Sequence, residues 1–152
     1  MSKSPMSSFS KVSTADIKDE LRNATSISDV LNKFDGYMQT RNLAEYLNIL
    51  VAKHNIIIAD VVRDSGIDKG YVYHIFNGKR KNPSRDKMIA IAFGMHLNEE
   101  ETQRMLKLAG HRELYAMVPR DAAILFAIQH GMSIEGTDEA LFKKGLPTIL
   151  SE

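Results

Sequence analysis

The sequence has 152 residues, which is the length of one domain with a short appendage. Its 43% hydrophobic and 26% charged residues are typical of a globular chain and argue against a fibrous or wholly disordered one. Cysteine is absent, which excludes disulfide bonds, thiolate metal sites and a cysteine nucleophile, and a net charge of +1 favours no particular partner.

The N-terminal residues and the hydrophobic pattern bear on localisation. The opening stretch MSKSPMSSFSKVST has no apolar segment of the kind found in secretory signals. No apolar run approaches the roughly 20 residues that a membrane-spanning helix needs. We therefore expect a cytoplasmic protein without membrane association, and the lack of cysteine fits a reducing compartment.

The first part of the chain is predicted to be an appendage. Residues 1–13 are rich in serine and show no apolar period, so a disordered tail is predicted there. Residues 14–41 are predicted to form an N-terminal helical extension. Ile17 and Leu21 are spaced as on an amphipathic helix, and Ser26 is expected to cap a second helix.

Residues 42–110 carry a series of short helical patterns with clear start and stop signals. Asp68, Ser84 and Asn98 are suited to helix N-caps, and Gly66 and Gly78 to the left-handed residue that ends a helix. Helices are expected from Asn42 to about residue 54, over 58–65, from Asp68 to Phe76, from Ser84 through Phe93, and from Asn98 to Gly110.

Residues 111–152 are predicted to be a C-terminal helical extension. Pro119 is expected to start a helix that ends at Gln129, and Ser133 a last helix that ends at Gly145. No segment of useful length alternates between apolar and polar residues as a half-buried strand would. The predicted fold class is therefore all-α.

The middle of the chain has the pattern of two short helices that cross at a sharp turn. Val61 and Val62 are expected to face inward on the first helix, Gly66 to occupy the turn, and Val72 and Ile75 to form the inner face of the second helix. The outer face of the second helix is then left free, and it carries Lys69, Gly70, Tyr73, His74 and Asn77.

Positive charge is concentrated in the same region. Between residues 69 and 87 the only acidic residue is Asp86, so the rest of the chain is net acidic. The basic residues of this segment are Lys69, Lys79, Arg80, Lys81, Arg85 and Lys87.

The segment DVVRDSGIDKGYVYHIFNGKRKNPSRDKMIAIAFGM resembles the helix-turn-helix of Cro/C1-type (XRE, lambda-repressor-like) transcriptional regulators. The resemblance covers residues 43 to about 97. It implies a lambda-repressor-like bundle with extra N- and C-terminal helices, in which helix 68–76 enters the major groove of double-stranded DNA. The residues it places at the DNA are Lys69, Gly70, Tyr73, His74, Asn77, Lys79, Arg80 and Lys81. It also implies a two-fold dimer and association with the nucleoid.

Three positions depart from the pattern of this family. Ile58 stands where a glutamine is common, Asp68 where serine or threonine is usual, and Gly70 offers no side chain to read a base. These departures leave an alternative open, in which the same fold is a protein-interaction module, such as an adaptor or an antitoxin, with weak or no DNA reading. The helices after Pro119 are expected either to bind a protein partner or a second copy, or to complete the core.

Catalytic, metal and cofactor sites are not predicted. The sequence has no phosphate-binding glycine loop, nucleophile elbow or HExxH motif. None of its five histidines lies three or four residues from another, as paired metal ligands on a helix would. We therefore expect a protein that is not an enzyme.

Overall fold

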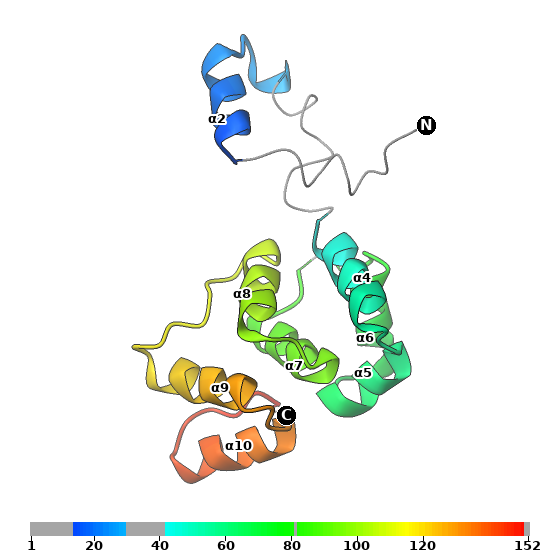
Figure 1. The fold of residues 1–152 in the computed structure, drawn as a ribbon, viewed down its shortest axis with the longest axis vertical. Coiled ribbons are helices and arrows are strands. Elements are labelled where there is room, and N and C mark those ends of the chain that lie inside the picture. Colours follow the sequence, from blue (N-terminus) through cyan, green and yellow to red (C-terminus); the bar gives the residue numbers. More distant parts are fainter. Residues whose placement is uncertain (1–13, 30–41, 81, 151–152) are drawn as a thin grey trace. The chain divides into compact units, whose positions relative to one another are not determined.

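A computed structural model describes residues 14–29, 42–80 and 82–150 of the chain. Within these ranges the regular structure is helical and contains no strand, which confirms the predicted all-α class. The chain divides into two units, Met1–Asn42 and Leu43–Glu152 (Figure 1). The predicted disordered tail, the second part of the N-terminal extension and Lys81 lie outside the described residues.

The N-terminal unit contains helix α2, Thr14–Asn23. The Asn23 side chain donates a hydrogen bond to the carbonyl oxygen of Asp19 in the last turn of this helix. The Ser26 hydroxyl accepts a hydrogen bond from the Asp29 N–H at 3.0 Å, at the start of the helical residues 27–29. This bond confirms Ser26 as the cap of a second helix.

The C-terminal unit is a bundle of short helices. In chain order these are α4 (Asn42–His54), α5 (Ile58–Ser65), α6 (Lys69–Phe76), α7 (Arg85–Met95), α8 (Glu99–Leu108), α9 (Pro119–Gln129) and α10 (Ile134–Lys143). None of the helices in the described ranges is long and apolar enough to cross a bilayer.

Helix α7 forms the centre of this bundle. Every residue from Met88 to Met95 is buried, and such a helix has to be surrounded by other helices. Helix α5 packs along α7, and α8 and α10 pack against it as well (Figure 1). Gly94 makes the approach of α5 possible, because a Cβ atom at this position would lie 2.7 Å from the carbonyl oxygen of Val61.

The N-termini of the helices are fixed by the residues that the sequence indicated. The hydroxyls of Ser84 and Ser133 cap α7 and α10, and Pro119 stands in the first turn of α9. Asn98 and Glu101 form a reciprocal capping box at the start of α8. These contacts confirm the predicted helix starts.

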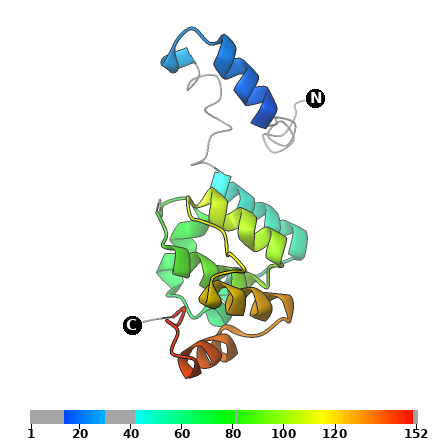
Figure 2. The same ribbon diagram turned by 90° about the vertical axis from the view of Figure 1, so that its left-hand side faces the viewer.

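The last described segment returns to the turn between α5 and α6. The Asp138 carboxylate accepts hydrogen bonds from the N–H groups of Ile149 and Leu150, at 2.6 and 3.0 Å. The Leu150 side chain then lies against Gly66, where a Cβ atom would be only 2.6 Å from Leu150 Cδ1. Figures 1 and 2 show α9 and α10 side by side at this end of the bundle.

Candidate nucleic-acid interface

The turn between α5 and α6 is fixed by a buried serine and a left-handed glycine. Ser65 is fully buried, and its hydroxyl accepts a hydrogen bond from the Ile67 N–H at 3.1 Å. Gly66 has φ 71°, a conformation that favours glycine. Ile67, which is 4% exposed, is the apolar anchor of this turn.

The inner face of α6 holds the helix in place. Val72 and Ile75 are buried, as predicted, and Phe76 joins them in the core. At the C-terminal end, the Asn48 side chain on α4 donates a hydrogen bond of 2.9 Å to the carbonyl oxygen of Phe76. On the neighbouring helix α5, Val61 is fully buried but Val62 is only partly buried.

Asp68 caps the N-terminus of α6. Its carboxylate accepts a hydrogen bond from the Tyr71 N–H at 3.2 Å. An acidic group in this position also interacts favourably with the positive end of the helix dipole. The carboxylate therefore has a structural role that explains why an acidic residue stands at the start of this helix.

The outer face of α6 is open to solvent along its whole length. The ammonium group of Lys69 lies 5.9 Å from the centre of the Tyr73 ring, and Tyr73 is 41% exposed. The exposed residues of this face are the predicted Lys69, Gly70, Tyr73, His74 and Asn77.

The turn after α6 carries further predicted residues. Gly78 has φ 81°, and the Arg80 N–H donates a hydrogen bond of 3.0 Å to the carbonyl oxygen of His74. The Asn77 side chain accepts a hydrogen bond from the Lys79 N–H at 3.0 Å. Lys79 and Arg80 are both exposed and directly follow the open face of α6. Lys81 is outside the described residues.

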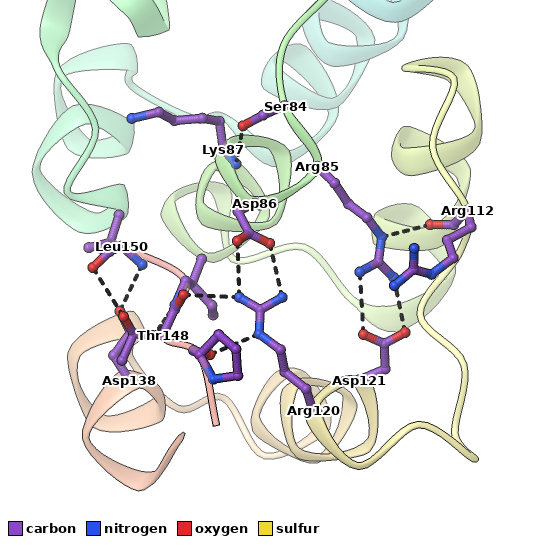
Figure 3. Close-up of polar contacts among 12 residues, drawn as sticks. Ser84, Arg85, Asp86, Lys87, Arg112, Arg120, Asp121, Asp138, Thr148 and Leu150 are labelled. Carbon is purple, nitrogen blue, oxygen red and sulfur yellow. Dashed lines mark hydrogen bonds and ion pairs between the residues drawn. The ribbon is translucent and has the colours of Figure 1, made fainter. Parts of the chain in front are cut away.

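Arg85, which the sequence counted in the local concentration of positive charge, is largely buried and does not belong to the exposed basic surface. Its guanidinium forms an ion pair of 3.0 Å with Asp121 and donates a hydrogen bond to the carbonyl oxygen of Arg112 (Figure 3). It also donates a hydrogen bond to the carbonyl oxygen of Glu113. The side chains of Arg85 and Asp121 are 13% and 1% exposed. Nothing in the local sequence indicated this pairing, because the partners lie far apart along the chain.

The environment of Asp121 keeps its carboxyl group ionised. Burial by itself would raise the pKa of Asp121, but the hydrogen bonds from Arg85 and from the Tyr115 N–H outweigh burial, so that the pKa lies below its ordinary value. The charge of Arg85 is therefore compensated inside the protein.

The acidic residue of the same segment is also compensated internally. The Asp86 carboxylate pairs with the Arg120 guanidinium through contacts of 3.0 and 3.1 Å (Figure 3). Arg120 donates further hydrogen bonds to the carbonyl oxygens of Pro147 and Thr148. Asp86, the only acidic residue between positions 69 and 87, is therefore paired inside the protein with Arg120 and does not neutralise the exposed basic residues near α6.

A cleft of 530 Å³ lies beside the start of α7. Its walls include the Arg85 and Arg120 guanidinium groups, both held in the ion pairs just described. Within residues 14–29, 42–80 and 82–150, no group of three His, Asp or Glu side chains could hold a metal ion.

No protein-family model matches the chain, and searches of curated proteins and of solved structures found no significant match either. The arrangement of α5, α6 and the turn that follows is therefore interpreted from its own geometry. That geometry presents one exposed helix face, polar and partly basic, with two cations at its C-terminal end.

Proposed function

We propose that this protein is a DNA-binding transcriptional regulator that inserts α6 into the major groove. The observation that carries the proposal is the exposed outer face of α6, next to a cationic turn. A major groove about 12 Å wide admits one α-helix. The inner face of α6 is fixed by core contacts, so the helix can be presented as a rigid element.

The residues at this face suit the two kinds of contact that a DNA reader makes. Lys69 and Asn77 have side chains that hydrogen-bond to base edges, lysine to guanine and asparagine to adenine. Lys79 and Arg80 are placed to neutralise phosphates beside the groove. Gly70 has no side chain, so the backbone of α6 can approach the bases closely at that point.

The expected assembly follows from the symmetry of DNA sites. Readers of this kind bind two half-sites as two-fold dimers, and we extend the proposal to a homodimer on a palindromic operator. Such a regulator would act in the cytoplasm, on the nucleoid.

The direct test is a fluorescence-anisotropy titration of the purified protein against labelled duplex DNA. We expect binding at about 50 mM salt that weakens steeply by about 200 mM, because phosphate contacts release counterions. A protein that fails to bind at low salt, or whose affinity is indifferent to salt, would contradict the proposal.

Substitutions separate base reading from phosphate contact. Arg80→Ala should weaken binding to all sequences alike and lower the slope of log affinity against log salt by about one. Tyr73→Ala and Lys69→Ala should instead change the preference among sequences, measured by competition between duplexes. If all three variants bind like the wild type, α6 is not the reading helix.

A second candidate function is a protein-interaction module on the same fold. The observation that favours it is a set of large apolar side chains exposed in the C-terminal extension: Tyr115 (60%), Met117 (78%), Phe126 (55%) and Phe142 (76%). Such exposure is common at binding surfaces. An affinity purification that returns one stoichiometric protein partner, together with no DNA affinity, would favour this candidate.

A further inference from the structure

Tyr71 lies at the edge of the open face of α6 and contacts two cations from outside that helix. The guanidinium carbon of Arg80 lies 4.3 Å from the centre of its ring, and the ammonium group of Lys87 lies 5.3 Å from it. The Tyr71 hydroxyl also accepts a long hydrogen bond, 3.4 Å, from the N–H of Ser84. One aromatic side chain therefore connects α6, the turn after it and the first turn of α7.

The position of Tyr71 places these cations next to the exposed face. Tyr71 and His74 are three residues apart, so they are neighbours on the helix surface. The Arg80 N–H is bonded to the carbonyl oxygen of His74, and the Arg80 side chain turns back onto the Tyr71 ring. The pair Arg80 and Lys87 thus borders the same side of α6 that Tyr71 and His74 occupy.

Both cations keep their charge available. Within the described part of the chain, neither Arg80 nor Lys87 forms an ion pair with a carboxylate, in contrast to Arg85. A cation–π contact with the ring uses none of the guanidinium's hydrogen-bond donors, so these N–H groups remain able to bind a phosphate. The ring reduces the freedom of the side chain without consuming its hydrogen-bond donors.

We infer that Tyr71 is a positioning residue that holds Arg80 and Lys87 together as one binding site for a DNA backbone phosphate. This inference rests on the proposed DNA-binding function and adds Lys87, which the sequence did not assign to the interface. Two cations held in place bind an anion more tightly than two mobile ones, because less side-chain entropy is lost on binding.

The deciding comparison is between Tyr71→Leu and Tyr71→Phe, neither of which removes a charge. Tyr71→Leu removes the ring, and we expect affinity for duplex DNA to fall about threefold to tenfold, with a shallower salt dependence. Tyr71→Phe keeps the ring and should bind within about twofold of the wild type. Thermal unfolding midpoints, measured for both, separate this effect from a loss of folding.

The role of Lys87 has its own test and control. Lys87→Ala should lower the salt slope by about 0.9, as expected for one lost phosphate contact. Lys107→Ala is the matched control, because Lys107 is exposed on α8 and lines a separate cleft with Tyr46. In a variant with both Arg80 and Lys87 changed to alanine, Tyr71→Leu should have no further effect on affinity.

The outcomes distinguish this inference from the proposed function. If the wild type binds DNA, and Tyr71→Leu and Lys87→Ala bind equally well at every salt concentration, the phosphate site is wrong and the reading helix stands. If Tyr71→Leu only lowers the melting temperature, Tyr71 is a packing residue. If the wild type does not bind, both proposals fall. The contact between Arg80 and the Tyr71 ring can still be tested by NMR in that case. The ring current should shift the side-chain protons of Arg80 upfield in the wild type, and Tyr71→Leu should abolish this shift.

Discussion

Arg85 and Asp121 are both largely buried, so the contribution of each side chain to the stability of the fold depends on the presence of the other. Both Asp121 oxygens accept from the Arg85 guanidinium, at 3.0 and 3.3 Å, and one also accepts from the Tyr115 N–H. A carboxylate that is 1% exposed cannot recover its hydration if Arg85 is removed. The pair therefore fixes the start of α7 against α9.

Removal of Arg85 should be strongly destabilising. Arg85→Ala leaves the Asp121 charge buried without its partner, and we expect the free energy of unfolding to fall by about 3–5 kcal/mol. Urea denaturation measures this change. Lys143→Ala is the control, because both partners of the Lys143–Glu139 ion pair are exposed and this pair should contribute little. Equal effects of the two substitutions would show that the buried pair has no special role.

Helices α5 and α7 approach each other closely at Gly94. A Cβ atom at Gly94 would lie 2.7 Å from the Val61 carbonyl oxygen and 2.8 Å from Ser65 Cβ. Backbone atoms cannot move aside as the end of a flexible side chain can. The spacing of the two helices therefore depends on this glycine, although its helical conformation alone would allow any residue.

Gly94→Ala should push α5 away from α7. We expect a loss of about 1–3 kcal/mol of stability, as in other overpacked cores, measured by chemical denaturation. Gly70→Ala is a matched control on α6, where a Cβ would meet only the Asp68 side chain at 3.2 Å. That substitution should be neutral or slightly stabilising, because alanine favours helix over glycine. A stable Gly94→Ala variant would contradict the tight approach.

The elements show what the sequence could and could not indicate. Caps such as Ser84 and Asn98 act on the next three residues, so local reading located the helix starts correctly. The ion pair between Arg85 and Asp121 joins positions on different helices, and a local count of charge could not show that Arg85 is paired inside the protein. Lys87 was likewise counted as charge, and its contact with Tyr71 depends on where the first turn of α7 lies relative to α6.

At the scale of the whole molecule, carboxylates bind separate helices together. Glu101 on α8, which is 6% exposed, pairs with His54 on α4 at 2.8 Å. Burial would raise the pKa of Glu101, but the hydrogen bonds with His54 and with the Asn98 N–H lower it below its ordinary value. Hydrogen bonds with Arg63 and His96 lower the pKa of Asp64 to about 2.

These lowered pKa values predict loss of stability in acid. A carboxyl group whose pKa is lower in the folded state contributes its full stabilisation above the unfolded value, and this contribution is lost as the pH falls through the folded value. For Asp64 that window runs from the ordinary value of 3.8 down to about 2. Urea midpoints should therefore fall steadily as the pH is lowered below about 5. Glu101→Gln should make that decline shallower, whereas a flat profile would contradict these assignments.

Position 66 is restricted in two independent ways, by its backbone conformation and by its contact with Leu150. The backbone there has φ 71°, and the space above it is filled by a side chain from the opposite end of the unit. A smaller residue at position 150 would relieve the crowding but not the backbone strain. We therefore expect residue 150 to vary among homologues while residue 66 stays glycine, because the left-handed backbone requires glycine there whatever side chain faces it.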